Sequence, residues 1–472
     1  MASPADKRPV HRIRLKEGLR VSRRVLIAVG IVLMIAIGGN LPAALAAAPS
    51  KPITITWWIN PWRIAPPGFP ADKAPTAEDF PKWASEEFMR LNPGVTVKYE
   101  VVTNTGFDQK IAAAILAGNP PDVLRPIGFK REWARQGLLE PVEDYFTADD
   151  KQDFYGYAME VGKVGSHYYL FPWNNSNNGM GSTFLINPAI FKERGVSIPP
   201  LPERGWTVDE FMQAAQKLTF HRDGDGKTDV YALSFPAKEL LVMMGWMHVF
   251  GARLFNADQT EVVLNSPEGV RALQFVVDAI YKYKIAPEGA AGMGIYDSIN
   301  MFHQGKTAMG YGGPYEIGRI DRYVKEGQLK EAFSVHITQY PNLPEIGPIA
   351  HHTSGGFVVF KQRDAEKKKV VMDFARFLTS KDNMTLLKSL LYVTARKSVN
   401  KDLYKGSTFE KEVDVYTRAL DYGVPYFGTD ITTDPIDKHL QAMFEAALGR
   451  TKTPKQALDD FAREANKILF KK

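Results

Sequence analysis

Strand-like and helix-like segments alternate over residues 52–125, and this alternation constrains the fold more than any other feature. PITITWW, from Pro52, alternates apolar and polar residues, VTVKYEVV repeats the pattern from Val95, and a short apolar strand is expected after Pro121. Amphipathic helices are predicted between these strands. Strand, helix, strand, helix, strand is typical of an α/β domain with a largely parallel sheet.

Ligands of such sheets bind at the carboxyl ends of the strands. Asn60, Trp62 and Arg63 follow the first predicted strand, and Arg125 follows the third, so all four are candidate ligand contacts by position. Strand alternation puts the two tryptophans of ITITWW on opposite faces. We favour Trp58 for the site, with core packing as the alternative.

Residues 1–46 have the pattern of a signal peptide: a basic start, the apolar run VLIAVGIVLMIAIGG and an A-x-A sequence that ends at Ala46. We expect cleavage after Ala46 and a periplasmic or otherwise extracytoplasmic mature protein. An uncleaved membrane anchor is the alternative, but Asn40 and Pro42 interrupt the apolar run. SRRVLI resembles a twin-arginine export signal, so both that route and the Sec route stay open.

The charge of the chain is concentrated in this segment. Residues 1–46 contain eight Lys or Arg and two Asp or Glu, which leaves 51 bases and 51 acids for the rest. The neutral body removes the net-charge argument for nucleic-acid binding and leaves a local basic patch as the remaining basis for it. The chain has no cysteine, which excludes disulfides, thiolate metal sites and a lipid anchor on cysteine.

Three motifs that suggest phosphate or metal binding fail on their spacing. In FHQGKTAMGYGGPYE the GKT lacks the earlier glycine of a phosphate-binding loop, because Asn300 occupies that position. RDGDGKTD offers Asp223, Asp225 and Asp229, but Lys227 stands where a calcium loop needs an oxygen ligand, so a solvated turn is expected. The histidines form no zinc motif, so no metal and no cofactor are predicted.

Further along the chain, two helices carry clear start signals. Thr207 with Glu210 forms a capping-box pattern, and Thr453 with Pro454 begins a C-terminal helix that has one apolar stripe. No internal repeat and no long linker separates two domains. We therefore expect lobes formed by a chain that crosses back and forth.

The order of several short segments resembles the extracellular solute-binding proteins of ABC importers, in the carbohydrate-binding group that includes maltose-binding protein. The segments are ITITWW, FMRLNPGVTVKYE, KIAAAILAGNPPDV, ARQGLLEPV, GVSIPPLPERGWTVDEF, FHQGKTAMGYGGPYE, HTSGGFVVF and ARFLTSKDNMTLL. Together they cover most of residues 52–470.

The resemblance implies a type II periplasmic-binding-protein fold, that is, two α/β lobes joined by about three crossing strands. We place these crossings near 171–184, 337–356 and 391–399. The N-terminal lobe would then contain 50–172 and 352–394, and the C-terminal lobe 173–351 and 395–472. The implied partners are a sugar ligand and a membrane-embedded permease, and a monomer without nucleic acid is expected.

A sugar presents hydroxyl groups at its edge and C–H patches on its faces, so its site needs aromatic rings and short polar groups. The candidate contacts combine position, composition and resemblance: Trp58, Asn60, Trp62, Arg63, Asn104, Arg125, Trp173, Asn174, Trp246, Gly313, Tyr315, His352 and Gly355. Core packing is the alternative for Trp173 and for Tyr315.

Two other functions remain open from the sequence. An exported glycosidase would also have an aromatic cleft but needs a pair of carboxylates, which no motif marks. Alternatively, Arg63 or Arg125 would serve a phosphorylated polyol or another acidic or polar solute.

Overall fold

The computed structural model describes residues 49–175, 179–199, 205–222, 227–325, 327–425 and 435–471. Ala47–Lys472 form a single unit by their contacts, and everything below concerns that unit. The predicted signal peptide lies outside the described residues, as do Asp223 and Asp225. Within the described ranges, no helix has both the length and the apolar character to cross a bilayer.

The N-terminal lobe is built on a five-stranded sheet. In spatial order its strands are β2 (Val95–Val101), β1 (Ile53–Ile59), β3 (Val123–Leu124), β11 (Ser354–Val359) and β6 (Phe171–Asn175). β1 pairs in parallel with β2 and β3, which confirms the parallel arrangement predicted for residues 52–125. β11 is antiparallel to both β3 and β6, so the sheet is mixed.

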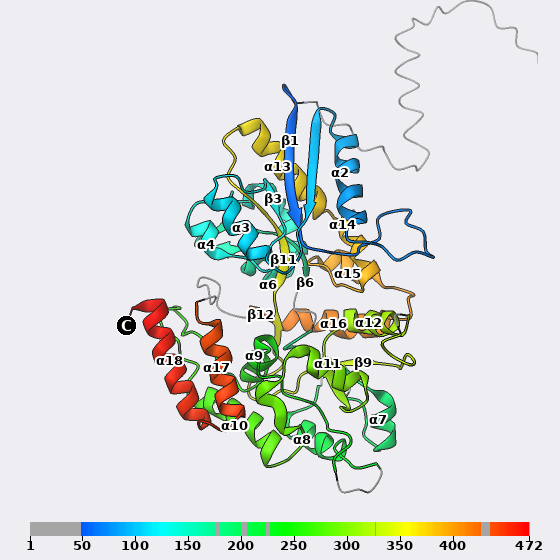
Figure 1. Ribbon diagram of the computed structural model, residues 1–472, viewed down its shortest axis with the longest axis vertical. Helices are drawn as coiled ribbons and strands as arrows, with labels where there is room; N and C mark the ends of the chain where they lie inside the picture. The colour runs from blue at the N-terminus through cyan, green and yellow to red at the C-terminus, as the bar shows by residue number, and fades with distance from the viewer. Residues whose placement is uncertain are drawn as a thin grey trace, which may run out of the picture. The chain divides into compact units, whose positions relative to one another are not determined.

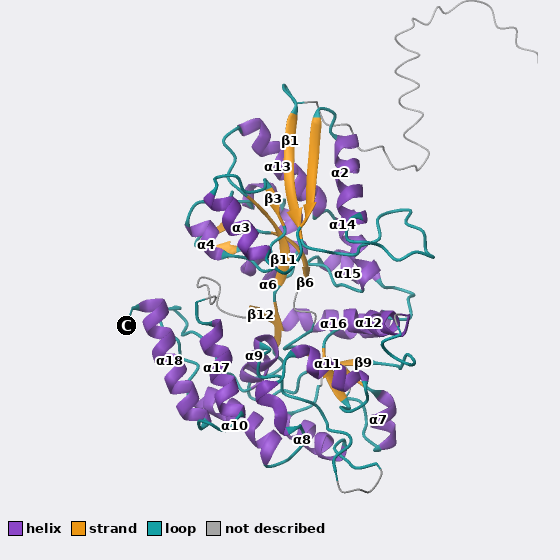
Figure 2. Cartoon of the chain, viewed as in Figure 1, coloured by secondary structure: helices purple, strands orange, loops and turns teal. Residues whose placement is uncertain are grey.

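Helices cover this sheet because the apolar face of each strand requires a partner. α2 (Asp79–Leu91) packs against β2, and α13 (Ala365–Leu378) packs against β11 (Figures 1 and 2). Trp57 is fully buried between them, with its ring 6.5 Å from that of Phe80 and 5.4 Å from that of Phe374. The other helices of this lobe are α3 (Phe107–Leu116), α4 (Arg131–Arg135), α5 (Ala148–Asp153), α6 (Gly156–Val161), α14 (Lys381–Met384), η4 (Thr385–Leu390) and α15 (Lys397–Leu403).

The C-terminal lobe is built on a three-stranded antiparallel sheet in the order β8 (Met309–Tyr311), β7 (Thr183–Ile186) and β9 (His336–Gln339). Its helices are α7 (Pro188–Glu193), α8 (Val208–Lys217), α9 (Leu240–Val249), α10 (Pro267–Tyr281), α11 (Ile295–His303), α12 (Pro314–Lys325), α17 (Asp437–Leu448) and α18 (Pro454–Phe470). The C-terminal α18 packs along α17 (Figure 1). This lobe has its own hydrophobic core.

The predicted helix starts are confirmed. Thr207 accepts a hydrogen bond from the Glu210 N–H while the Glu210 carboxylate accepts one from the Thr207 N–H, which is a capping box. Thr453 caps α18 in the same way, with Pro454 in the first turn. α12 begins at Pro314, so that Gly312 and Gly313 of the GGPY segment connect β8 to it.

Two connections between the lobes can be read from the order of the strands. The chain leaves the five-stranded sheet after β6 and enters the three-stranded sheet at β7, and it returns between β9 and β11. β10 (Ala350–His352) lies on that return and pairs in parallel with β12 (Gly423–Pro425), which follows α16 (Glu410–Ala419).

The third connection differs from the sequence-based placement at 391–399. The Asn175 N–H donates to the Val393 carbonyl and the Ala395 N–H donates to the Trp173 carbonyl, so this segment runs beside β6. Leu403 also lies in the core of the N-terminal lobe. The chain therefore passes to the other lobe only after α15, and these residues belong to the N-terminal lobe.

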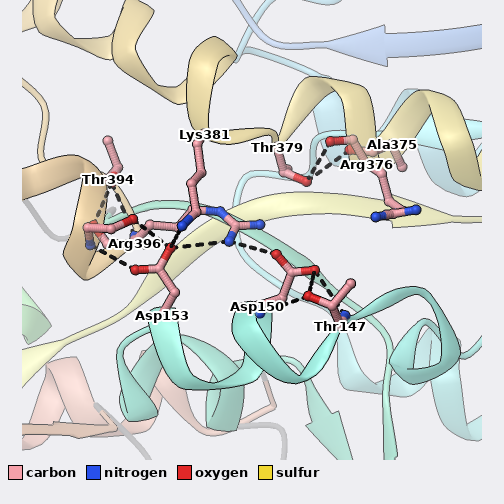
Figure 3. A network of polar contacts seen from close by, with 10 residues as sticks. Thr147, Asp150, Asp153, Ala375, Arg376, Thr379, Lys381, Thr394 and Arg396 are labelled. Carbon is pink, nitrogen blue, oxygen red and sulfur yellow. Dashed lines mark hydrogen bonds and ion pairs between the residues drawn. The ribbon is translucent and has the colours of Figure 1, made fainter. Parts of the chain in front are cut away.

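A polar network around the buried Arg396 holds this segment in place (Figure 3). Arg396 Nη1 lies 2.8 Å from an Asp150 carboxylate oxygen and 3.4 Å from one of Asp153, both on α5. Lys381 Nζ lies 3.2 Å from the same Asp153 oxygen, and Ser398 donates two hydrogen bonds to Asp153. The network ties α5, α14 and the start of α15 together.

Candidate functional site

A buried arginine lies at the carboxyl edge of the five-stranded sheet. Arg125 follows β3 directly and is 4% exposed. Its guanidinium carbon lies 4.1 Å from the ring centroid of Trp62 and 5.5 Å from that of Trp173. Its Nη1 donates to Asn60 Oδ1 at 2.7 Å. The guanidinium is thus surrounded by aromatic faces and a neutral amide.

The sheet topology explains why these residues meet. β1 and β3 are parallel neighbours, so Asn60 and Trp62, after β1, lie at the same edge as Arg125, after β3. The Arg125 N–H donates to the Trp58 carbonyl at 2.9 Å, which continues the pairing of the two strands. The structure thus places these three residues at the carboxyl edge, where their sequence positions put them, and their contact with a ligand stays a prediction.

Asn60 orients its neighbours. Its Oδ1 accepts from Trp62 Nε1 at 2.9 Å as well as from Arg125, while its Nδ2 donates to Asn104 Oδ1 at 3.2 Å. Asn104, after β2, is exposed. A row of amides therefore runs along the strand ends from the buried arginine to solvent.

The positive charge of Arg125 has no carboxylate partner in the described part of the chain. Burial lowers the pKa of Arg125 to about 9, so it stays protonated at neutral pH. Its Nε has no hydrogen-bond acceptor among the described residues. A Cβ at Gly355 would lie 2.6 Å from Asn174 Oδ1 and 2.9 Å from Arg125 Nη2, so the absence of a side chain there leaves room for the guanidinium.

Four aromatic rings continue outward from Arg125, and we call them the aromatic series. Between ring centroids, Trp173 lies 5.2 Å from Trp62, and Trp62 lies 4.9 Å from Tyr392. The Tyr392 centroid lies 5.0 Å from that of Tyr315 on α12. Trp173 is fully buried, whereas the other three are partly exposed. The series includes three of the predicted aromatic contacts and one, Tyr392, that the sequence analysis missed although it lies in the segment proposed as the third crossing.

The outer end of the aromatic series borders a cavity of about 560 Å³. Loop 63–75, α12, η4 and the residue before α16 form its walls. The lining residues are Arg63, Ala71, Asp72, Lys73, Ala74, Pro75, Tyr315, Gly318, Arg319, Arg322, Lys388, Ser389, Leu390, Leu391 and Phe409. Of the predicted contacts, Arg63 and Tyr315 lie here, and Gly313 is buried directly before α12, where its carbonyl accepts from the Glu316 N–H.

Trp246 and Trp58 lie apart from this arrangement. Trp246 is fully buried in the core of the C-terminal lobe, and its Nε1 donates to the Tyr311 hydroxyl at 3.3 Å. Trp58 is half-buried, with Lys110 Nζ 4.7 Å above its ring, and packs against a core cluster that contains Phe107. Core packing accounts for Trp246, so we leave it out of the proposed site.

His352 was predicted to face the cleft, but the structure buries it completely at the connections between the lobes. Its Nδ1 lies 3.0 Å from Asn175 Nδ2 and its Nε2 3.1 Å from the Ala419 carbonyl oxygen. The Tyr416 hydroxyl donates to Asn175 Oδ1 at 2.6 Å. Burial lowers the pKa of His352 to about 3, so it is neutral and donates from Nε2 to the carbonyl. Residues of all three connections thus share one network.

Metal binding receives no support from the described residues. Among them, no three His, Asp or Glu side chains gather as a metal site would require. The backbone N–H of Arg222 donates to Asp229, the described end of the RDGDGKTD segment.

A model of the family described as bacterial extracellular solute-binding protein matches residues 73–385. The chain belongs to this family. The membership agrees with the resemblance drawn from the order of the sequence segments.

Among curated relatives in this family, the maltotriose-binding protein of Pyrococcus abyssi is 26% identical over 240 residues, which is 50% of this chain and 46% of that protein. The chain spans about half the length of the curated relatives it matches.

Two solved structures extend the comparison to almost the whole chain. The cyclic α-maltosyl-1,6-maltose binding protein of Arthrobacter globiformis has a TM-score of 0.69 at 20% identity and covers 89% of this chain and 100% of its own. An ABC substrate-binding protein of Listeria monocytogenes in complex with cycloalternan has a TM-score of 0.66 at 21% identity, over 89% of this chain and 99% of its own. These similarities confirm the two-lobed α/β fold.

Proposed function

We propose that the protein is an extracytoplasmic receptor that binds a sugar or oligosaccharide and delivers it to the permease of an ABC importer. The observation that carries the proposal is the aromatic series with its amides and Arg125 at the carboxyl edge of the sheet. Rings stack on the C–H faces of a sugar while amides and guanidinium groups bind its hydroxyls. The ligands of similar proteins, maltotriose and cycloalternan among them, support the same class.

We expect a binding protein without catalysis, and the description of the family as solute-binding supports this expectation. We expect a monomer that contacts the permease when loaded. The ligand class is tested by a thermal-shift screen over mono-, di- and oligosaccharides and polyols, because a ligand that binds only the folded state raises the melting temperature. Calorimetry then measures affinity. A sugar that is degraded during prolonged incubation would instead indicate a glycosidase.

Trp62→Ala is expected to weaken binding of the ligand identified in that screen by about 1.5–3 kcal/mol, roughly 10- to 150-fold, because it removes the contact of one large ring. Trp62 is the partly exposed ring nearest to Arg125. Trp83→Ala is the matched control, since Trp83 is also partly exposed in the N-terminal lobe but packs on Phe80 and Phe377. Isothermal calorimetry measures the ligand affinity of both variants. If the two variants bound the ligand equally well, Trp62 would not be part of the site.

Export is expected to end with cleavage after Ala46, so that the mature chain begins at Ala47. The A-x-A sequence after an interrupted apolar run motivates this expectation. N-terminal sequencing of the exported protein measures it. A chain that still begins at residue 1 or 2 and stays with the membrane would establish the anchor.

A further inference from the structure

The cavity beside Tyr315 carries far more positive than negative charge. Five of its lining side chains are cationic and one is acidic: Arg63, Lys73, Arg319, Arg322 and Lys388 against Asp72. They come from loop 63–75, α12 and η4, which are far apart in the sequence. Because the body of the chain is neutral as a whole, this local excess is a property of the cavity.

Most of this charge is not compensated within the protein. Arg63, Lys73 and Lys388 form no ion pair with any described residue. Arg319 does have a partner, Glu316, whose carboxylate oxygen lies 3.1 Å from Nη1. Glu316 is almost fully buried and is not among the lining residues, and burial raises its pKa to about 7 although Arg319 and Arg322 oppose this. Only part of the Arg319 charge is therefore neutralised at neutral pH.

The cavity is continuous with the proposed sugar site through one ring. Tyr315 ends the aromatic series and also lines the cavity, with the Arg319 guanidinium carbon 5.0 Å from its ring centroid. The volume of about 560 Å³ lies within the range of small-molecule sites. At the other end of the series, Arg125 adds one more cation without a carboxylate partner among the described residues. A saccharide stacked on the series would reach the cavity at its outer end.

We propose that this cavity is an anion-binding subsite, and that the physiological ligand is a saccharide that carries a carboxylate, sulfate or phosphate group. The exposed Lys73, Lys388 and Arg63 attract the anion, while Arg319, whose guanidinium lies over the Tyr315 ring, adds positive charge at the cavity wall. The sugar rings stack on the three partly exposed rings of the aromatic series, which are Trp62, Tyr392 and Tyr315. This inference rests on the function proposed above and narrows its ligand class.

The experiment measures the affinity of matched neutral and charged saccharides: maltotriose with maltotrionate, galactose with galacturonate, and glucose with glucose 6-phosphate. The charged member of at least one pair is expected to bind about tenfold more tightly or better, and its affinity should fall several-fold between about 20 and 200 mM salt, since exposed charges are screened. The neutral member should show no such salt dependence. The uronate and phosphate pairs distinguish carboxylate from phosphate recognition.

The variant Lys73→Gln/Lys388→Gln removes two exposed cavity charges. It should lower the preference for the charged member about three- to tenfold and leave the neutral affinity unchanged. The control Lys192→Gln/Lys217→Gln makes the same change of net charge on exposed lysines of α7 and α8, away from the cavity. It should behave as the wild type does.

The outcomes separate the two proposals. Neutral members that bind as tightly as charged ones, or a preference unchanged in the cavity variant, would overturn the anionic subsite and leave the sugar receptor standing. Absence of binding to every saccharide, neutral or charged, would overturn the sugar receptor and this inference together.

Discussion

Trp173→Ala is expected to lower the free energy of unfolding by about 3–5 kcal/mol, the cost of truncating a buried aromatic side chain. Trp173 has no exposed surface, and its ring lies 5.9 Å from Phe80 and 5.2 Å from Phe357. Its conspicuous amide neighbours suggested a stacking platform, but in this structure a ligand cannot touch the ring. Equilibrium chemical denaturation, followed by circular dichroism, measures the loss.

Trp57→Ala serves as the reference for that measurement, because Trp57 is equally buried in the same core. The two variants should unfold at similarly reduced denaturant concentrations. If Trp173→Ala unfolded like the wild type and yet lost ligand affinity, the ring would be a ligand platform, and the conformation that binds ligand would have to expose it.

Arg396→Met is expected to destabilise the fold by about 3 kcal/mol, the lower end of the range for breaking a buried ion pair. Arg396 is 7% exposed, and its loss leaves Asp150 and Asp153, at 16% and 10%, without their shared cation (Figure 3). The remaining Lys381, 3.2 Å from Asp153, limits the loss. Thermal and chemical denaturation at pH 7 measure it.

The effect should shrink in acid. Burial would raise the pKa of both carboxyl groups, but hydrogen bonds, chiefly from the backbone N–H groups of Thr147 and Ser398, and the nearby cations outweigh it, so each pKa is lowered. A carboxyl group with a lowered folded pKa stabilises above its unfolded value, about 3.9, and loses that contribution as the pH falls through the folded value. The difference between wild type and Arg396→Met should therefore narrow below about pH 4.

Arg418→Met is the control for this prediction. Arg418 pairs with Asp414 one helical turn away, and both side chains are more than 40% exposed. Its replacement should cost less than about 0.5 kcal/mol at any pH, as exposed pairs do. A pH-independent loss in Arg396→Met would mean that the packing of its side chain on Phe154, and not its charge, stabilises the segment.

The part of the site that could be predicted from the sequence depends on local order. Asn60, Trp62 and Arg125 could be predicted because each follows a strand that the sequence pattern predicts. Since these strands are parallel neighbours, their carboxyl ends lie together. Tyr392 was missed because its place depends on hydrogen bonds between residues 393–395 and β6, more than two hundred positions earlier in the chain. Local patterns carry no information about such a pairing.

Trp246 is the opposite case, because its burial could have been predicted from the sequence around it. The helix LLVMMGWMHV has no polar face, and a helix that is apolar on all sides is buried in a core. Trp246 became a candidate because its segment shows no single apolar stripe. A helix without a stripe because all its sides are apolar is nevertheless buried on every side.

The buried group of His352, Asn175, Tyr416 and the Ala419 carbonyl ties the three connections at one point. Sliding one lobe past the other would break these bonds where water does not reach to replace them, whereas a turn about the group leaves them intact. We therefore expect this joint to permit rotation of one lobe against the other and to resist translation between them.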